Sequence, residues 1–424
     1  MVEENQELQP PAHDRAWPLY GAAFATGLSL SIAWTALPFV LNAIGGTAAH
    51  VGYAPATNSL AYMAALLVTG ALLGHLDVKR ATRVAMVVAI VAASLMALGV
   101  LGALLLPAVH YRIWVWTIIA AGGLGGMAMA LHWPFLMSWV SGRYEGVELN
   151  RRFGRYNGSW SGGGLVGPLI GAWLVEIGPV WPMLAAVLCL VVSFLLLGLG
   201  RNGTGRAQSP AQATDTAEVP NNARMLADYR WMSRIALFCA WASFAIARSQ
   251  FALLFIELGY SESQFGLYLT TIALCNFMAL TAGGRWAFWH FKAGLLIGAQ
   301  GMILVAMLMI IYGRTVGVFL VSAVVLGVAF GFAYSSHLFY GASTSRKRSG
   351  RMAIHEMVIS VGITVGAGAG GYLAKNVGLY APYWFAVSLV ALGMMVQILI
   401  HTASRATLAL HRAGDASNGP GAAD

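Results

Sequence analysis

The chain has 424 residues, of which 58% are apolar and 10% are charged. A soluble protein of this size would carry about 25% charged residues, so the composition excludes a surface meant for water. The 50 glycines are spread through apolar stretches, which excludes collagen-like and disordered chains. The three cysteines also lie in apolar runs and predict buried thiols, not disulfides or a metal site. We therefore expect a polytopic membrane protein.

Apolar stretches of about 20 residues, separated by charged or turn-rich breaks, predict membrane-spanning α-helices. The first is longer than the apolar core of a signal peptide, so we expect it to be retained. The sequence predicts twelve such helices, at 18–42, 55–75, 84–106, 114–140, 159–176, 181–200, 234–258, 264–283, 293–313, 316–342, 352–374 and 383–402.

The basic residues are distributed unevenly between the two sides that this arrangement defines. The N-terminal tail, alternate loops and the C-terminal tail hold 21 of the 25 Lys and Arg residues. The opposite loops hold three, and the remaining one, Arg248, falls within a helix. Because loops facing the cytoplasm collect Lys and Arg, we expect both termini in the cytoplasm. We expect the protein to span the cell (inner) membrane. The same rule explains the net charge of +9 without a nucleic-acid partner.

A polar stretch at 201–233, which contains Pro210 and Pro220, is typical of a flexible cytoplasmic linker. It divides the chain into two six-helix bundles, at 18–200 and 234–402. The cytoplasmic tails are then 1–17 and 403–424, and we expect the chain after Arg405 to be disordered.

Glycines recur every four residues in the fifth and in the eleventh predicted helix. Such spacing forms a flat stripe on which a second helix can pack closely. The same glycine spacing in the corresponding helix of each half indicates an internal duplication. The alternative is a chance match in a glycine-rich chain. The predicted packing residues are Gly163, Gly167 and Gly171 in the first half, and Gly362, Gly366 and Gly370 in the second.

Between 15 and 405, the twelve helices in two sets of six resemble the major facilitator superfamily of transporters. The loop from Gly74 to Arg83 is similar to the signature that this family carries between its second and third helices, with the acid three residues after the glycine instead of four. The segment from Gly154 to Pro168 is similar to the fifth-helix region. The resemblance implies alternating access, a cavity lined by the first, fourth, seventh and tenth helices, and latch residues at Asp77 and Arg83. An ordinary basic loop with one acid is the alternative for these two residues.

Arg248 lies about 21 Å along the seventh helix from its cytoplasmic start, past the middle of a bilayer. A charged group at this depth is costly in lipid and is a candidate functional group. In a cavity, its guanidinium could bind an anionic group of a substrate through two hydrogen bonds. The alternative is a structural arginine held by backbone carbonyls or by a distant acid.

Glu356 lies about 6 Å into the eleventh helix and follows His355. A carboxylate desolvated there could take up a proton, so both residues are candidates for proton coupling. The alternative is an ion pair of Glu356 with Arg348 or Arg351 near the interface. Aligning the glycine stripes makes Asn157 the equivalent of Glu356, which makes Asn157 a candidate gating residue.

Five further residues are polar or aromatic groups that a cavity could use to bind substrate. A lone histidine on an apolar helix is more often a packing residue, so the two histidines have that alternative role. The candidates are Trp34, His132, Gln250, Asn276 and His337.

The sequence predicts a secondary active transporter for a small organic solute, with an anionic group favoured by Arg248 and a proton as the coupling ion. No phosphate-binding loop, metal motif or nucleophile motif is present, so we expect no enzymatic activity, no cofactor and no metal. We expect a monomer. An efflux pump for amphipathic compounds is the alternative within transport, and a non-transporting scaffold or sensor is the alternative of another class.

Overall fold

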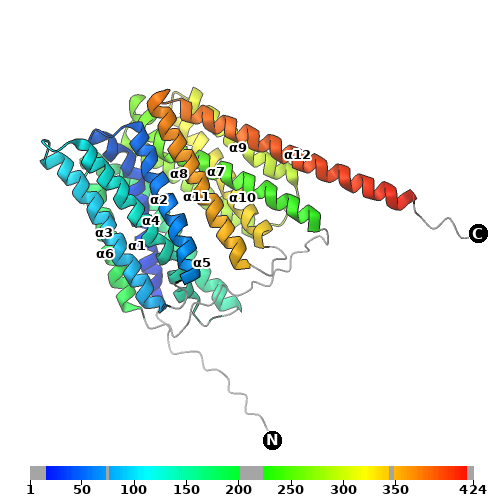
Figure 1. The fold of residues 1–424 in the computed structure, drawn as a ribbon, viewed down its shortest axis with the longest axis horizontal. Helices are drawn as coiled ribbons and strands as arrows, with labels where there is room; N and C mark the ends of the chain where they lie inside the picture. Colours follow the sequence, from blue (N-terminus) through cyan, green and yellow to red (C-terminus); the bar gives the residue numbers. More distant parts are fainter. Residues whose placement is uncertain are drawn as a thin grey trace, which may run out of the picture.

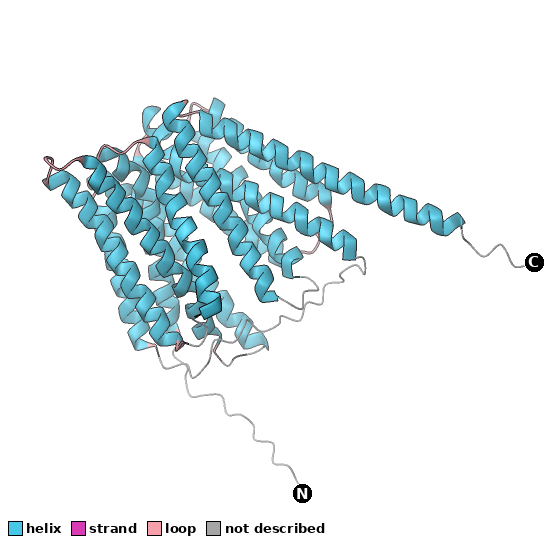
Figure 2. Cartoon of the chain, viewed as in Figure 1, coloured by secondary structure: helices cyan, strands magenta, loops and turns pink. Residues whose placement is uncertain are grey.

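The computed structural model describes residues 16–72, 76–142, 144, 146–200, 223–342 and 348–417. These residues form twelve α-helices and no strand, which confirms the predicted fold class (Figure 2). The helices are α1 (Trp17–Ala43), α2 (Ala48–Leu72), α3 (Val78–Leu105), α4 (Tyr111–Ser141), α5 (Gly146–Ile177), α6 (Trp181–Leu199), α7 (Ala223–Glu257), α8 (Glu262–Arg285), α9 (Ala293–Tyr312), α10 (Val316–Ala342), α11 (Arg348–Asn376) and α12 (Ala381–Ser417).

Most helices have the length and the apolar surface of membrane-spanning helices. Ten of them are long and apolar enough to cross a membrane; α2 and α5 do not reach that apolarity. On α6, Leu188, Leu195 and Leu199 share one face, and their side chains are 60–64% exposed. Such a row of exposed leucines is stable only where the surrounding solvent is apolar. The chain is a multi-pass membrane protein.

The two halves repeat one packing pattern. In the first half, α1 packs on α5 and α6, α4 packs on α2 and α3, and α3 packs on α6. In the second half, α7 packs on α11 and α12, α10 packs on α8 and α9, and α9 packs on α12. Adding six to each helix number converts the first set into the second. Figure 1 shows the two sets side by side, with α3 and α6 at one edge of the molecule and α9 and α12 toward the other.

Two helix pairs make the most extensive contacts between the halves, α2 with α11 and α5 with α8. Smaller contacts join α7 to α1 and α2, and α1 to α8. The two pairs are equivalent in the repeat, because α2 of the first half corresponds to α8 of the second and α5 corresponds to α11. α2 packs on α4 and α11, and α5 packs on α1 and α8, so each of these two helices has protein neighbours in both halves.

We define the basic end of the bundle as the end where α1, α3, α5, α7, α9 and α11 begin, and the far end as the opposite one. At the far end the halves are in close contact: a side chain added at Gly52 of α2 would meet the backbone of Gly371 of α11 at 2.7 Å. The rings of Phe39 on α1 and Phe265 on α8 stack edge to face at 5.4 Å. The backbone N–H of Ser263 donates to Glu176 at 2.9 Å. In this conformation the molecule is closed at the far end.

Several helices extend beyond the predicted boundaries at the basic end, three of them by more than ten residues. α5 begins at Gly146, α7 begins at Ala223 inside the expected linker, and α12 continues to Ser417 through the expected tail (Figure 1). The predicted boundaries were placed at the first charged residues, but Arg, Ala and Leu favour helix whether or not lipid surrounds them. The rest of the expected linker, 201–222, and the tail segments 1–15 and 418–424 lie outside the described residues.

Candidate functional site: a cavity between the two bundles

A cavity lies between the two halves of the molecule. Its empty volume is about 570 Å³, including the part that opens to solvent. Its walls come from α1 and α2 of one half and from α7 and α11 of the other. α4 and α10, which the family resemblance implied as cavity helices, contribute none of the described lining. The lining residues are Trp34, Leu37, Pro38, Val51, Pro55, Asn58, Trp241, Phe244, Ala245, Arg248, Ser249 and Ile363.

Among the described lining residues, Arg248 is the only charged one. It lies on one face of α7 together with four other lining residues, since 241, 244, 245, 248 and 249 follow the spacing of a single helical face. Among the described residues, no hydrogen bond, ion pair or nearby charge engages its side chain. The acid on the same helix, Glu257, lies about 13 Å further along the axis and is exposed. The cavity therefore presents an arginine whose charge no described carboxylate balances.

The rest of the cavity wall is largely apolar and aromatic. Trp241 packs edge to face on Phe330 of α10 at 4.7 Å, and Phe244 lies 4.9 Å from the same ring. The indole Nε1–H of Trp241 is buried and has no acceptor within the described part of the chain. On α2, the Nδ2 of Asn58 donates to the carbonyl of Gly122 at 2.8 Å. Of the polar groups in this wall, the amide N–H of Asn58 is thus already engaged within the protein, and Arg248 is the charged donor that the described lining offers to a solute.

Three of the other predicted substrate residues face elsewhere. Gln250 is two residues from Arg248, about 200° around the helix, and its Nε2 donates to the carbonyl of Ala48 on α2 at 3.4 Å. His132 is fully buried inside the first bundle, with its ring 5.1 Å from that of Trp133. Asn276 faces α10, where a side chain added at Gly331 would meet its Oδ1 at 3.0 Å. Of the six predicted substrate residues, only Arg248 and Trp34 line the cavity.

The remaining candidate, His337, pairs with another predicted residue. The Nδ1 atoms of His337 on α10 and His355 on α11 lie 2.8 Å apart, within hydrogen-bond distance. Both rings are buried, and Tyr334 lies edge to face on His355 at 4.7 Å. For this contact to be a hydrogen bond, one Nδ1 must carry the proton and the other must accept it. The pair lies between α10 and α11, near the basic end of the second bundle.

Glu356 belongs to the interface between the bundles. The hydroxyl of Tyr62 on α2 donates to its Oε2 at 3.3 Å. One turn away in the same interface, the hydroxyl of Ser59 donates to the carbonyl of Ser360 at 3.1 Å. The side chains of Arg348 and Arg351, the alternative partners of Glu356, lie outside the described residues.

The three predicted latch and gating residues make contacts within the first bundle. The carboxylate of Asp77 caps α3 by accepting from the backbone N–H of Arg80 at 2.8 Å. The guanidinium of Arg83 lies over the ring of Phe194 on α6 at 4.8 Å. Asn157 is exposed and accepts from the indole of Trp160 at 3.1 Å. None of these three described contacts bridges the two halves.

The two glycine stripes pack on equivalent helices. Gly163, Gly167 and Gly171 of α5 lie against α1, and a side chain added at Gly171 would meet the carbonyl of Ile32 at 2.6 Å. Gly362, Gly366 and Gly370 of α11 lie against α7, and a side chain added at Gly362 would meet Trp241 at 2.9 Å. The second stripe therefore holds a cavity residue in place.

Sequence reasoning missed the contribution of α2 to the cavity, which includes Pro55 and Asn58. The available signals were a proline inside a helix, which marks irregular packing, and a carboxamide in an apolar span. Ser249 was missed because its neighbour Arg248 was considered alone. The hydroxyl of Ser249 donates to the carbonyl of Ala245 at 2.7 Å.

Comparison with known proteins agrees with this architecture. The family model described as Major Facilitator Superfamily matches residues 19–336 and 234–416. A search of curated proteins finds no match.

Three solved structures share the fold at low sequence identity. The nucleoside transporter NupG (D323A mutant) aligns with a TM-score of 0.69 and 11% identity over 91% of this chain and 99% of that one. A POT family transporter in complex with a thioalcohol-conjugated peptide aligns with a TM-score of 0.67 and 14% identity, over 92% of this chain and 96% of that one. The human organic anion transporter MFSD10 (TETRAN) aligns with a TM-score of 0.58 and 15% identity, over 92% of this chain and 100% of that one.

The repeated six-helix halves, the cavity between them and the family match along nearly the whole chain lead to one conclusion: this protein belongs to the major facilitator superfamily, whose members are secondary transporters.

Proposed function

We propose that this protein transports a small organic solute with an anionic group, by alternating access, and that Arg248 binds the anionic group. The observation that carries this proposal is the position of Arg248 as the only charge among the described residues that line the cavity, with no described carboxylate beside it. A guanidinium desolvated in such a site is stabilised by an oxyanion that accepts two parallel hydrogen bonds. The anionic group of the solute would supply the counter-charge that no described residue provides to Arg248.

The cavity wall supports an apolar or aromatic body for the rest of the solute. Trp34, Trp241 and Phe244 line it, and aromatic rings bind flat apolar groups well. Relatives in fold include proteins described as organic anion, nucleoside and peptide transporters. At 11–15% identity they support the fold of a small-solute transporter and do not select among these substrates.

We further propose that transport is coupled to protons through Glu356. This carboxylate lies in the interface that must separate when the halves rock, where Tyr62 is its hydrogen-bond partner. Tyr334 of α10 is also close to it. A proton that neutralises Glu356 would weaken its contact with Tyr62 and favour separation of α2 from α11. A purely structural role in holding the two helices is the alternative.

For the cellular setting, we propose a monomer in the inner membrane with both termini in the cytoplasm. The support is the concentration of Lys and Arg at the basic end of the bundle. The far end, closed in this conformation, would then face the outside, and the cavity would exchange solute with the cytoplasm.

Uptake into proteoliposomes tests the proposal. A panel of radiolabelled carboxylates is supplied with and without a pH gradient to wild type, Arg248→Ala, Glu356→Gln and the exposed control Arg285→Gln. Carboxylate uptake should fall at least tenfold in Arg248→Ala only, and pH dependence should vanish in Glu356→Gln only. Uptake that survives in Arg248→Ala contradicts the anion site.

A second candidate function is export of amphipathic compounds, favoured by the cluster of Trp241, Phe244 and Phe330 next to the cavity. Uncharged aromatic dyes tested in the same vesicles would then be transported equally well by wild type and by Arg248→Ala. A complete lack of flux for carboxylates and dyes alike would favour a non-transporting scaffold or sensor.

A further inference from the structure

Two prolines lie inside helices at the wall of the cavity, Pro38 in α1 and Pro55 in α2. Proline has no backbone N–H, so each one leaves the carbonyl four residues earlier without its donor in the helix. These two carbonyls belong to Trp34 and Val51, which also line the cavity, and we call them the cavity carbonyls. Residues four apart lie one above the other on a helix, so each of these carbonyls lies on the face that its helix turns to the cavity.

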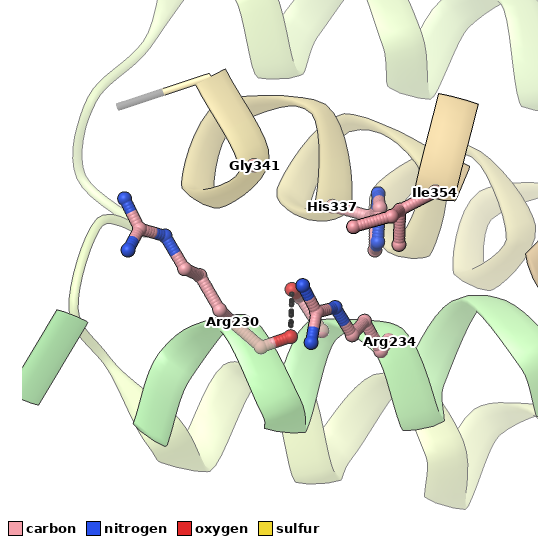
Figure 3. Close-up of a pocket in the computed structure, with 6 residues that line it drawn as sticks. Arg230, Arg234, His337, Gly341 and Ile354 are labelled. Carbon is pink, nitrogen blue, oxygen red and sulfur yellow. Dashed lines mark hydrogen bonds between the residues drawn. The ribbon is translucent and has the colours of Figure 1, made fainter. Parts of the chain in front are cut away.

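Elsewhere in the chain, carbonyls without a donor in their own helix find one in another part of the protein. Pro168 of α5 leaves the carbonyl of Gly164 without its donor, and the hydroxyl of Ser31 on α1 donates to that carbonyl at 3.1 Å. The carbonyl of Tyr340, close to the end of α10, accepts from the Nε of Arg230 at 2.9 Å. Figure 3 shows Arg230 extending from α7 toward that end of α10. Among the described residues, no side chain and no neighbouring helix donates to either cavity carbonyl.

The two cavity prolines are not part of the repeat that relates the halves. α7 and α8 correspond to α1 and α2, and the sequences of α7 and α8 contain no proline. A proline inside a helix is costly, so the fold alone does not favour two of them beside one cavity. A group that donates to the carbonyls they expose would offset that cost, which indicates a role for these carbonyls in binding.

The cavity carbonyl of Val51 lies at a depth similar to that of Arg248. The Nε2 of Gln250 on α7 donates to the carbonyl of Ala48 on α2 at 3.4 Å, and this contact fixes how the two helices are aligned. From Gln250, Arg248 is two residues, or about 3 Å, closer to the basic end. From Ala48, Val51 is three residues, or about 4.5 Å, closer to the same end, since α2 runs in the opposite direction.

Acceptor oxygens gather on the α1 and α2 side of the cavity, across from Arg248 on α7. Pro38 and Pro55 are five and seven residues from the connection between α1 and α2, so the cavity carbonyls lie at similar depths. Asn58 adds a third oxygen, because its Nδ2 donates to the carbonyl of Gly122 and its Oδ1 is left as an acceptor. The cavity therefore presents a guanidinium donor on one wall and acceptor oxygens on the other.

We propose that the solute is a zwitterion, with a carboxylate that binds Arg248 and an ammonium group that binds the cavity carbonyls. This inference rests on the proposed anion transport and adds the second charged end of the solute. An ammonium group has three N–H donors, which suit several acceptor oxygens, and the aromatic rings of Trp34 and Trp241 favour a nearby cation. A solute without such donors would leave the acceptors unpaired in the occupied cavity, which lowers its affinity.

Thermal stability of the purified protein in detergent measures binding, since a ligand that binds the folded state raises Tm. Phenylalanine is compared with three analogues that share its ring. Hydrocinnamate lacks the ammonium group, phenethylamine lacks the carboxylate, and phenyllactate has a hydroxyl in place of the ammonium group. Alanine, propanoate, ethylamine and lactate form a second set. We expect at least one of the two amino acids to bind wild type at least tenfold more tightly than each of its own analogues.

Alanine substitutions at the prolines test the carbonyls directly. Pro38→Ala and Pro55→Ala restore the missing N–H, so each cavity carbonyl regains its donor in the helix. Pro134→Ala restores an N–H in α4, outside the described cavity lining, and is the control. We expect both cavity variants to bind the amino acid at least fivefold more weakly than wild type and to bind its matched carboxylate within twofold of wild type. Retained carboxylate binding shows that the variants are folded, and Pro134→Ala should leave both affinities unchanged.

Several results would overturn the zwitterion. They are equal binding of amino acid and matched carboxylate by wild type, unchanged amino acid binding in both Pro38→Ala and Pro55→Ala, and no binding of any member of either set. Tighter binding of phenyllactate than of phenylalanine would assign the carbonyls to a neutral hydroxyl. A higher Tm in sodium chloride than in potassium chloride that is lost in Pro55→Ala, with no preference for the amino acid, would assign them to a metal cation.

The Arg248→Gln variant separates this inference from the proposed function. If it weakens binding of carboxylate and amino acid while the proline variants change neither, the anion site stands and the ammonium site fails. If it changes neither, while the proline variants weaken binding of phenylalanine and phenethylamine alike, the carbonyls bind an ammonium group and the anion site fails.

Discussion

The hydroxyl of Tyr62 on α2 donates a hydrogen bond of 3.3 Å to the carboxylate of Glu356 on α11, across the interface between the two bundles. In the proposed alternating access these halves move relative to each other, so this contact would change during transport. Its two members can be altered separately, which makes the proton proposal testable apart from the packing of the two helices.

Glu356→Gln should remove the dependence of transport on pH, since glutamine keeps the size of the side chain and cannot titrate. Tyr62→Phe is the matched control, because it removes the same hydrogen bond and leaves the carboxylate in place. We expect Tyr62→Phe to retain a pH response in proteoliposome uptake. If uptake is independent of pH in both variants, or if Glu356→Gln keeps the wild-type dependence of uptake on pH, Glu356 holds the helices together and does not carry the proton.

Gly171→Ala should destabilise the first bundle by about 1–3 kcal/mol, the range for adding a methyl group to a close-packed site. The added Cβ would lie 2.6 Å from the carbonyl of Ile32 on α1. Gly164→Ala on the same helix meets nothing within 4 Å and serves as the control. Thermal unfolding in detergent should show a lower Tm for the first variant only. Equal Tm values would mean that α5 and α1 adjust without loss.

Gly52→Ala should disfavour the conformation closed at the far end, because its Cβ would meet the backbone of Gly371 at 2.7 Å. Gly368→Ala alters the same interface, but its Cβ would lie 3.6 Å from Ala56, an ordinary van der Waals contact. Spin labels on the far ends of α2 and α11 report their separation. We expect a longer or broader distance distribution in Gly52→Ala and a wild-type distribution in Gly368→Ala. The same distribution in both variants would show that this glycine contact does not limit closure.

The proposed orientation rests on where the basic residues lie, and labelling tests it. In a background without Cys189, Cys239 and Cys275, single cysteines at the exposed positions Lys375 and Arg155 mark the far and basic ends. A membrane-impermeant thiol reagent added to intact cells should label Lys375→Cys and should reach Arg155→Cys only after lysis. The reverse pattern would place the termini outside.

Helix positions could be predicted well from the sequence, because lipid requires long apolar runs and every such run is visible in the residues. We expected Arg248 about 21 Å from the start of its helix, but α7 begins at Ala223, so Arg248 lies 25 residues, or about 38 Å, from that start. The direction in which a side chain faces around its helix was harder to predict. Arg248 and Gln250 were both expected in the cavity, yet two residues on a helix face nearly opposite sides. One faces the cavity and the other faces Ala48.

Contacts between distant segments could not be predicted at all. Nothing in the sequence places Tyr62 beside Glu356 or His337 beside His355. Each pair depends on how one helix is aligned along another, which the residues of either helix alone do not determine. His132 and Asn276 were singled out for polarity alone, and the structure places them inside separate bundles. The extra length of α12 was missed because charge was taken as the end of a helix.

The most direct test of the central claim compares a carboxylate with its uncharged amide. Counterflow exchange in proteoliposomes is measured for benzoate and benzamide, and for further pairs of the same kind, with wild type, Arg248→Lys and Arg248→Gln. We expect wild type to exchange at least one carboxylate and exclude its amide, Arg248→Lys to keep a reduced rate, and Arg248→Gln to lose exchange at least tenfold. Equal exchange of carboxylate and amide in wild type, or undiminished carboxylate exchange in Arg248→Gln, would contradict the account.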